Sequence, residues 1–297
     1  MIFNGKNGPY LIAEIGGNHE GDFAYAQELT QLACDSGVDA VKFQIYTGDS
    51  LVNKKEDPDR NAHFKKFELK QEEYIFLAKQ CKKNNVEFSA SVWDPDAFSW
   101  IDPYLSFYKV GSGDMTAYPI LDIIISFGKP ILLSTGLSTM EEVIDTVEYI
   151  QTKNQRYLSR NFLAILQCTS MYPIPFEDAN LNVILEYKKE LKLKAGYSDH
   201  TKGNIAVETA VSMGADIIEF HFTDSREGKV FRDHQVSFTK DETIELIDKI
   251  KKINSLKGNG KKKPLKSELS SGHIQSFRRG LYFNKSLLKG EIIRKQD

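Results

Sequence analysis

The sequence lacks the features that define several protein classes. Only three of its 297 residues are cysteine and no two form a CxxC pair, which argues against a disulfide framework or a thiolate zinc site. No apolar run approaches the roughly 18 residues that a membrane-spanning helix needs. The 39 basic and 41 acidic side chains nearly balance, so no net field favours nucleic acid or a membrane surface as a partner. The first residues also lack the basic and apolar regions of a secretory signal, and we therefore expect a cytoplasmic protein.

Short apolar runs alternate with amphipathic segments along most of the chain, a pattern typical of parallel α/β proteins. The runs that predict strands are residues 11–16, 40–46, 86–92, 107–114, 130–136, 162–170, 194–200 and 217–223. The segments between them have helical periodicity, and a last helix is predicted at 241–253. Near-continuous apolar strands are buried on both faces. This series of units, with no GxGxxG after the first strand, favours a (β/α)8 TIM barrel over an open doubly wound sheet.

The composition changes where the predicted barrel domain, residues 1–256, ends. Residues 257–272 are basic, polar and rich in glycine and serine, and we interpret them as a linker. The lysine run 261–263 is the pattern of a nucleic-acid patch, but no aromatic residues interleave with it, so no nucleic-acid partner is expected. Residues 273–297 are too few to bury a core of their own.

Polar residues gather at the ends of the predicted strands, and in a (β/α)8 barrel the carboxyl ends of the strands carry the active site. Lys42 and Gln44 stand two apart on one strand and therefore point the same way. Glu14 lies in an apolar run, where an unpaired carboxylate is costly to bury. The other candidates at strand ends are Ser91, Lys109, Ser112, Asp114, Ser134, Ser170, Tyr172, Ser198, His200 and His221. We expect these side chains to converge on one rim.

Two kinds of ligand site are predicted on this rim. His200 and His221 end consecutive strands, so their imidazoles can meet and hold an octahedral divalent cation such as Mn2+, Co2+ or Mg2+. Two histidines that only form hydrogen bonds are the alternative. Lys42 and Lys109, together with serine hydroxyls and the loops GSGD and STG, are typical of an anion site. A phosphorylated or carboxylated substrate with two or more charges would suit it.

A set of motifs runs in order through most of the chain: IAEIGGNHEGD, AVKFQ, YKVGSGD, GKPILLSTG, CTSMYPIP, GYSDHTKG, EFHFT, RDHQVS and RRGLY. By these motifs the chain resembles the sialic acid synthase family, which includes N-acetylneuraminate, legionaminate and pseudaminate synthases. The resemblance implies a metal-dependent transferase that condenses phosphoenolpyruvate with the open-chain aldehyde of an N-acetylated amino sugar. The enol carbon would attack the aldehyde, water would add to the adjacent carbon, and phosphate would leave with C–O cleavage. A homodimer is the assembly that the resemblance implies.

The resemblance also implies roles for residues of this chain. Phosphoenolpyruvate would be bound by Lys42, Ser91, Lys109, Ser112, Ser134, Ser170 and Ser198. The sugar would contact Glu14, Gln44, Asp114, Tyr172 and Asp233. The divalent metal, Mn2+ before Co2+ or Mg2+, would lie between His200 and His221. The catalytic groups would be Glu14 or Asp114 for proton transfer, with Lys42 and Lys109 stabilising charge as phosphate departs.

The chain departs from the family pattern at several positions. The family commonly has Glu in place of Asp114, Asn in place of Ser170 and Thr in place of Ser91. Before Asp233 it usually has Gly-Pro, where this chain has Phe-Arg. The carboxylate at position 114 is therefore one methylene shorter than the usual one.

The C-terminal region is a further departure. Family members normally continue into a complete antifreeze-like (SAF) domain, which reaches over the partner's barrel and supplies an arginine that recognises the sugar's N-acetyl group. Residues 273–297 resemble only the opening of that domain. We hypothesise that Arg232 supplies a substitute guanidinium at the sugar end, and a surface pairing with Asp224 or Glu227 is the alternative.

Two other functions compete with an N-acetylneuraminate-type synthase. One is a legionaminate- or pseudaminate-specific member, which would use a 2,4-diacetamido sugar in place of N-acetylmannosamine. The other is a truncated, non-catalytic relative that binds phosphoenolpyruvate or sugar as a scaffold. The presence of both lysines, both histidines and Glu14 favours catalysis, because a scaffold has no need of them.

Overall fold

Eight short strands close into one parallel barrel in this computed structural model, which describes residues 3–296. The strands are β1 (Tyr10–Glu14), β2 (Ala40–Ile45), β3 (Glu87–Val92), β4 (Tyr108–Val110), β5 (Ile131–Ser134), β6 (Leu163–Cys168), β7 (Lys194–Asp199) and β8 (Ile217–His221). Each pairs in parallel with the next, and β8 pairs with β1. The predicted (β/α)8 barrel is therefore confirmed.

The fourth strand is shorter than predicted. The apolar run 107–114 suggested a strand throughout, but β4 ends at Val110. After Gly111 the chain turns into the 3-10 helix η3 (Ser112–Asp114). A glycine with no side chain to pack weakens a strand, and the polar residues that follow it are free to turn over the barrel mouth.

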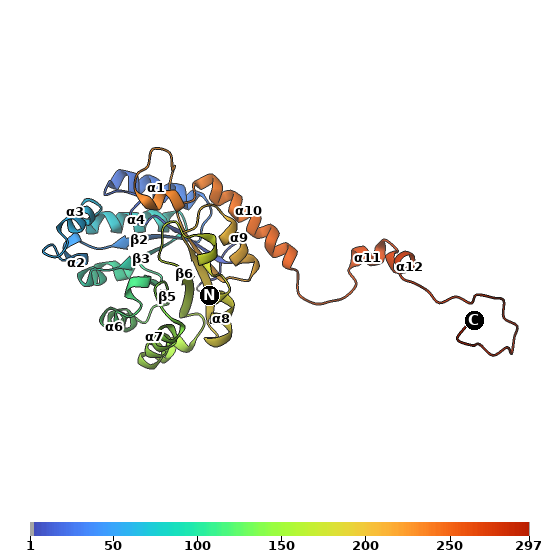
Figure 1. The fold of residues 1–297 in the computed structure, drawn as a ribbon. Coiled ribbons are helices and arrows are strands. Elements are labelled where there is room, and N and C mark those ends of the chain that lie inside the picture. The colour runs from blue at the N-terminus through green and yellow to red at the C-terminus, as the bar shows by residue number, and fades with distance from the viewer. Residues whose placement is uncertain (1–2, 297) are drawn as a thin grey trace. The chain divides into compact units, whose positions relative to one another are not determined.

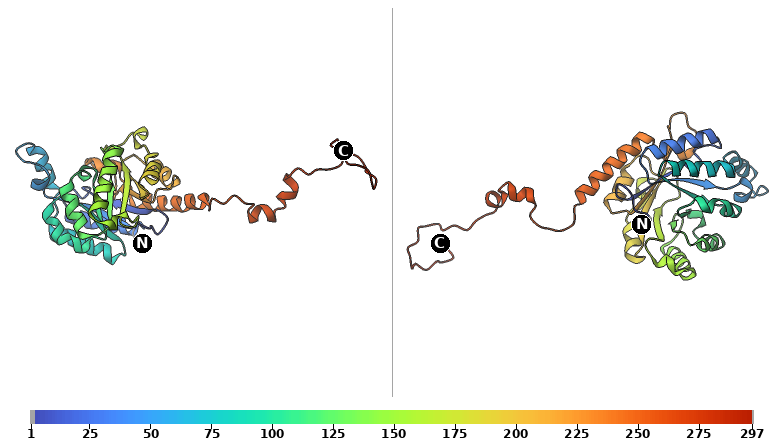
Figure 2. Two further views of the ribbon diagram at one scale, coloured as in Figure 1. Left: turned by 90° about the horizontal axis from the view of Figure 1, so that it is seen from below. Right: turned by 180° about the vertical axis from the view of Figure 1, so that it is seen from behind.

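Helices surround the strands, as Figure 1 and the two views of Figure 2 show. The main ones are α1 (Phe23–Asp35), α4 (Gln71–Lys83), α6 (Tyr118–Phe127), α7 (Met140–Lys153), α8 (Val183–Glu190), α9 (Ile205–Ser212) and α10 (Lys240–Lys257). Their starts are capped as the sequence allows: the Asp22 side chain accepts from the Tyr25 backbone N–H, and Thr139 forms a capping box with Glu142. The last of these helices is longer than the predicted 241–253.

Several short elements lie between the main ones. They are α2 (Gly48–Leu51), α3 (Pro58–Lys66), α5 (Phe98–Ile101) and the 3-10 helices η1 (Pro95–Ala97), η2 (Asp102–Tyr104), η4 (Gln155–Leu158), η5 (Phe176–Ala179) and η6 (Arg232–Val236). The pair α2–α3 was not predicted. Buried Asn61 holds it together, because its side-chain amide donates to the carbonyl oxygens of Gly48 and Val52, both at 2.9 Å.

Alternation along the strands divides the side chains into two sets. One set, such as Leu11 and Ala13, packs outward under the helices in the main core. The other set points into the barrel, where apolar residues form a separate cluster: Phe3, Tyr10, Ile12, Ala40, Phe107, Leu132, Ala164, Leu166 and Ile217. Gly196 has to be glycine in this barrel, since a Cβ there would lie 2.0 Å from the Ile217 carbonyl oxygen.

The polar lumen residues follow this apolar cluster toward the carboxyl ends of the strands. The strand register places Glu14 beside Lys42 and His221. It also places Ser91 beside Lys109 and Ser198 beside Glu219. The barrel is thus filled with apolar side chains at one end and with charged ones at the other.

The chain divides into two units, one ending at Lys257 and one beginning at Gly258. The second unit contains α11 (Lys266–Ser270), which forms inside the segment expected to be a linker, and α12 (His273–Phe277). None of its described residues is buried, so this segment has no core of its own. Residues 1, 2 and 297, which the domain predictions included, lie outside the described residues. Within residues 3–296 no helix is both long and apolar enough to span a membrane.

Candidate active site

A cavity of about 920 Å³ opens at the carboxyl ends of the strands. All the predicted site residues line it: Glu14, Lys42, Gln44, Ser91, Lys109, Ser112, Asp114, Ser134, Ser170, Tyr172, Ser198, His200, His221 and Asp233. They come from seven of the eight strands or from the loops that follow strands, so barrel closure is what brings them together. Their individual roles stay predictions.

The floor of the cavity is a network of buried charges on β1, β2, β4 and β8. Lys42 Nζ lies 2.7 Å from Glu14 Oε2 and 3.9 Å from Glu219 Oε2. Lys109 Nζ lies 3.8 Å from Glu219 Oε1. None of these four side chains is more than 7 % exposed. Glu219 therefore bridges two ammonium groups that belong to different strands.

The pKa values in this network move in different directions. Burial works to lower the pKa of Lys42, but Glu14 and Glu219 together outweigh it and leave that pKa raised. Lys109 has no carboxylate as close as Glu14 is to Lys42, and burial outweighs the attraction of Glu219, so the pKa of Lys109 is lowered. Burial raises the pKa of Glu14 more than Lys42 lowers it, whereas for Glu219 the two lysines outweigh burial and the pKa falls. Of the two lysines, Lys109 is the one with less compensation from carboxylates.

Hydroxyl groups converge beside Lys109. Its ammonium donates to Ser134 Oγ at 2.7 Å and to the Val110 carbonyl at 3.1 Å. The backbone N–H of Gly136 donates to Ser112 Oγ at 2.9 Å. A Cβ at Gly136 would lie 2.3 Å from Ser170 Oγ and 2.8 Å from Ser112 Oγ, so only glycine lets the two serines approach this loop. Three serine hydroxyls, a backbone turn and a buried ammonium make a donor-rich pocket that suits an anion.

His200 and His221 lie together at the edge of the same cavity. Their ring centroids are 5.2 Å apart. His200 Nδ1 is 2.9 Å from the carbonyl oxygen of Thr169, which only accepts, so Nδ1 carries the proton and Nε2 keeps its lone pair. His221 Nδ1 is buried with no hydrogen-bond partner among residues 3–296. Burial lowers the pKa of each to about 3, which keeps both rings neutral near pH 7.

These two imidazoles fit a divalent cation, since neutral rings with free lone pairs and an unpartnered buried nitrogen are what a metal needs. The described residues hold no cluster of three or more His, Cys, Asp or Glu side chains placed to bind a metal ion. Asp233 comes nearest to completing one, with Oδ2 3.9 Å from His221 Nδ1. Water and substrate oxygens would therefore have to complete the coordination shell.

Arg232 occupies this side of the cavity. Its guanidinium lies over the Tyr172 ring, 4.5 Å from the centroid, and its Nε is 3.1 Å from Asp233 Oδ1. The Tyr172 ring in turn stacks on His200, with centroids 4.0 Å apart. The predicted alternative, a surface pairing with Asp224 or Glu227, is therefore wrong. Instead, Asp224 contacts Tyr25, Thr223 and Lys229.

Sequence reasoning missed some residues of this cavity. Glu219 has no predicted role, although its position two residues before His221 places it on the lumen face. The aromatic side of the cavity mouth was also missed. There the ring centroids of Phe67 and Phe231 lie 4.9 Å apart, and the ring centroid of His63 lies 4.7 Å from that of Phe67. No sequence signal pairs residues 63–67 with Phe231, because their contact depends on how two loops fold.

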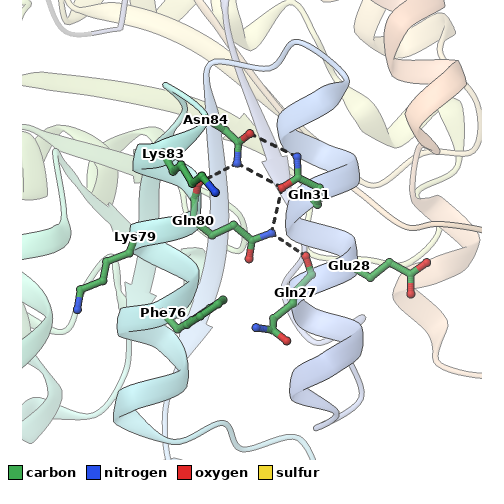
Figure 3. A pocket seen from close by; sticks show the side chains of 8 residues that line it. All are labelled: Gln27, Glu28, Gln31, Phe76, Lys79, Gln80, Lys83 and Asn84. Carbon is green, nitrogen blue, oxygen red and sulfur yellow. Dashed lines mark hydrogen bonds between the residues drawn. The ribbon is translucent and has the colours of Figure 1, made fainter.

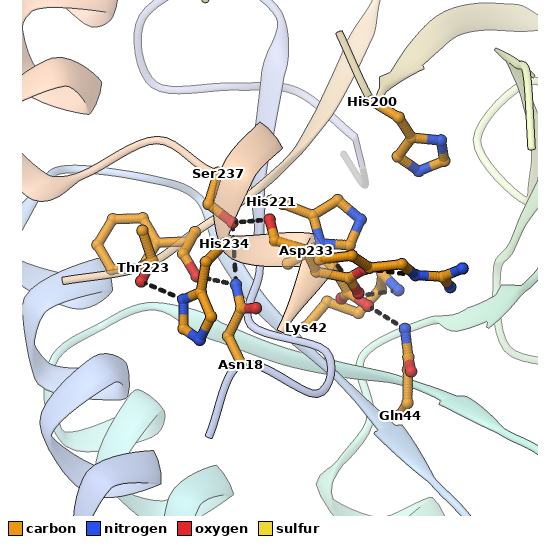
Figure 4. A network of polar contacts seen from close by, with 12 residues as sticks. Asn18, Lys42, Gln44, His200, His221, Thr223, Asp233, His234 and Ser237 are labelled. Carbon is orange, nitrogen blue, oxygen red and sulfur yellow. Dashed lines mark hydrogen bonds and ion pairs between the residues drawn. The ribbon is translucent and has the colours of Figure 1, made fainter. Parts of the chain in front are cut away.

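A buried polar network supports the loops behind the cavity (Figure 4). The Asn18 side-chain amide donates to the Phe222 carbonyl and to Ser237 Oγ, both at 2.9 Å. Ser237 Oγ donates to the Asp233 carbonyl at 2.7 Å. These bonds tie the loop after β1 to η6, which carries Arg232 and Asp233.

A second hollow lies outside the barrel between α1 and α4 (Figure 3). Hydrogen bonds join the two helices across it: Gln80 Nε2 donates to the Gln27 backbone carbonyl at 3.0 Å, and Gln31 Nε2 donates to Asn84 Oδ1 at 3.3 Å. It belongs to the outer helical layer, not to the strand ends. We interpret it as a contact that locks the two helices together.

Comparisons with known proteins show the family to which the chain belongs. Residues 29–262 match the NeuB family. The chain is 34 % identical to the N,N'-diacetyllegionaminic acid synthase of Legionella pneumophila, over 97 % of this chain and 83 % of that protein. It is 30 % identical to the human N-acetylneuraminate-9-phosphate synthase, over 90 % of this chain and 76 % of that protein. The crystal structure of the N-acetylneuraminic acid (sialic acid) synthetase of Leptospira borgpetersenii serovar Hardjo-bovis in complex with citrate superposes with a TM-score of 0.82 at 29 % identity, covering 91 % of this chain and 92 % of that one. The chain therefore belongs to the NeuB family.

Proposed function

We propose that this protein is a nonulosonic acid synthase, which condenses phosphoenolpyruvate with an N-acetylated amino-sugar aldehyde and releases phosphate. One observation carries the proposal: a single cavity holds two buried ammonium groups, one of them hydrogen-bonded to a serine hydroxyl, and two neutral imidazoles. The first group suits a trianionic substrate and the second suits a divalent cation.

Phosphoenolpyruvate is proposed to bind on the side of β4, β5 and β6. Lys109 and Ser134 already share a hydrogen bond of 2.7 Å there, and Ser112 and Ser170 flank Gly136. The anion would supply the negative charge that Lys109 lacks, which offsets the unfavourable burial of this ammonium. As the C–O bond to phosphate breaks, the same lysine stabilises the charge that develops on the leaving group.

The acceptor sugar is proposed to bind on the opposite side, against Gln44, Tyr172 and Asp233. Glu14 and Asp114 are the two carboxyl groups available to take a proton from the attacking water and to give one to the new hydroxyl. Burial raises the pKa of both, which moves each closer to a value where it can exchange protons near neutral pH. Glu14 accepts a hydrogen bond of 2.8 Å from Gln44, so a sugar that contacts Gln44 lies within reach of this carboxyl.

His200 and His221 are the residues that would hold the metal, and Mn2+ is the ion we propose. When bound, the ion would polarise the aldehyde as a Lewis acid. The Thr169 carbonyl fixes the tautomer of His200 and so keeps Nε2 available. Homodimerisation, which rests on the family resemblance, and a cytoplasmic location, which rests on the sequence pattern, belong to the same proposal.

The acceptor that we propose to test first is a 2,4-diacetamido sugar, with N-acetylmannosamine second. The relatives named N,N'-diacetyllegionaminic acid synthase are 34 % and 32 % identical to this chain, and the human N-acetylneuraminate-9-phosphate synthase is 30 % identical. The difference is small, so it sets an order of testing and does not assign the sugar.

The test measures phosphate release from phosphoenolpyruvate with a panel of acceptor sugars, with and without Mn2+. We expect release only when both a sugar and Mn2+ are present. Lys109→Met is the matched inactive variant, because methionine keeps the length and removes the ammonium. Absence of release with every acceptor would overturn the proposal and favour a non-catalytic scaffold.

A further inference from the structure

We infer that Glu20, in the loop after β1, is a specificity-determining residue that accepts a hydrogen bond from a hydroxyl or amide N–H of the acceptor substrate. The inference rests on the proposed function and extends it to a residue with no assigned role. Glu20 lines the active-site cavity, and its side chain is 43 % exposed.

The backbone holds Glu20 in an unusual conformation. Its φ is 51°, in the left-handed region that residues with a Cβ rarely adopt. A turn fixes this conformation, because the Glu20 N–H donates to the Gly17 carbonyl at 2.9 Å. The next residue, Gly21, cannot change, since a Cβ there would lie 1.8 Å from the Lys66 carbonyl oxygen. Strain of this kind persists where the surroundings impose it, and it concentrates at ligand sites.

A buried histidine orients the Glu20 carboxylate. His234 has no exposed side-chain surface, and its Nε2 lies 3.1 Å from Glu20 Oε1. A carboxylate only accepts, so Nε2 carries the proton and Nδ1 is an acceptor. Thr223 Oγ1, 2.7 Å from Nδ1, therefore donates to the ring. These hydrogen bonds connect Thr223, just after β8, through His234 to Glu20 in the cavity wall. His234 is therefore a positioning residue for Glu20.

One oxygen of Glu20 is left for a ligand. Oε1 is bound by His234, whereas Oε2 has no hydrogen bond within residues 3–296. Glu20 stands beside the sugar side of the cavity, since its loop includes Gly17, where a Cβ would touch the Phe231 ring at 3.1 Å. Phe231 directly precedes Arg232 and Asp233. The phosphoenolpyruvate side, with Lys109 and Ser134, is on other strands.

The test is Glu20→Gln, with Glu28→Gln as the matched control. Glutamine keeps an oxygen that accepts from His234, and it replaces the free carboxylate oxygen with an NH2 group that donates. Glu28 is exposed on α1 outside the active-site cavity, so Glu28→Gln removes the same charge at a position where no substrate is proposed to bind. Phosphate release is measured against acceptor and against phosphoenolpyruvate separately, together with the melting temperature.

We expect Glu20→Gln to raise the KM for the acceptor about tenfold, the value of one hydrogen bond, with the KM for phosphoenolpyruvate and the melting temperature unchanged. Glu28→Gln should match the wild type in all three. An active wild type for which Glu20→Gln behaves like Glu28→Gln, or raises both KM values equally, overturns the inference alone. A wild type that releases no phosphate with any acceptor overturns the proposed function, and the inference with it.

Discussion

Glu219 forms ion pairs with two buried lysines, so its substitution by glutamine tests how far its negative charge stabilises them. Its oxygens lie 3.9 Å from Lys42 Nζ and 3.8 Å from Lys109 Nζ. At an effective dielectric constant of about 20, each pair is worth about 4 kcal/mol. Desolvation of the carboxylate cancels part of this, and we expect Glu219→Gln to lower the unfolding free energy by about 3–5 kcal/mol, the range for a buried pair that loses one partner.

Glutamine keeps the hydrogen bond that Ser198 Oγ donates to Oε1 at 2.9 Å. The variant therefore removes the negative charge and leaves the size of the side chain unchanged. Urea denaturation near pH 7 measures the loss, and Glu28→Gln is the surface control. Phosphoenolpyruvate should restore much of the stability of Glu219→Gln, because its anion would compensate Lys42 and Lys109 in place of the lost carboxylate. A loss below about 1 kcal/mol, similar to the control, would refute the reasoning that Glu219 compensates both lysines.

Three further predictions concern the proposed anion pocket, the proposed metal site and the buried His19. Gly136→Ala should raise the KM for phosphoenolpyruvate at least about tenfold, because the new Cβ displaces Ser112 and Ser170; an unchanged KM would contradict the proposed anion pocket. His221→Asn should weaken Mn2+ binding at least about tenfold in an electron paramagnetic resonance titration without substrates, and equal affinity would exclude this histidine as a ligand. Burial lowers the pKa of His19 to about 4 from its ordinary value near 6.5, so the folded state binds this proton less readily than the unfolded state. The stability that depends on neutral His19 is therefore complete above about pH 6.5 and is lost by up to about 1.4 kcal/mol per unit as the pH falls toward 4. Urea titrations from pH 7 to 4 should show a shallower decline for His19→Asn, whereas parallel curves would contradict the assignment.

The fold was predictable because each strand has a signal in its own local sequence. Residues 40–46 and 217–223, for example, are apolar runs between amphipathic segments, and a parallel sheet needs such runs because helices cover it. The period of two along a strand also showed that Lys42 and Gln44 share a face. The fourth strand was predicted, but its early end was not, since an apolar run cannot reveal that Gly111 ends the pairing.

The candidate site was predictable to the extent that a barrel collects its strand ends on one rim. That rule placed His200 with His221, and Lys42 with Lys109, before any distance was known. The same rule could not predict which residues of the rim contact one another. The sequence predicted no role for Glu219, because its importance lies in contacts with two lysines far away along the chain.

The sequence by itself determined the barrel, its polar rim and the family, because strand periodicity and motif order are properties of the linear chain. Only the tertiary structure decided which charges pair, that Arg232 stacks on Tyr172, and that a buried His234 orients Glu20. These contacts join loops whose conformations depend on one another. A pattern along one strand carries no information about them, since burial and hydrogen bonding between distant segments arise only when the barrel closes.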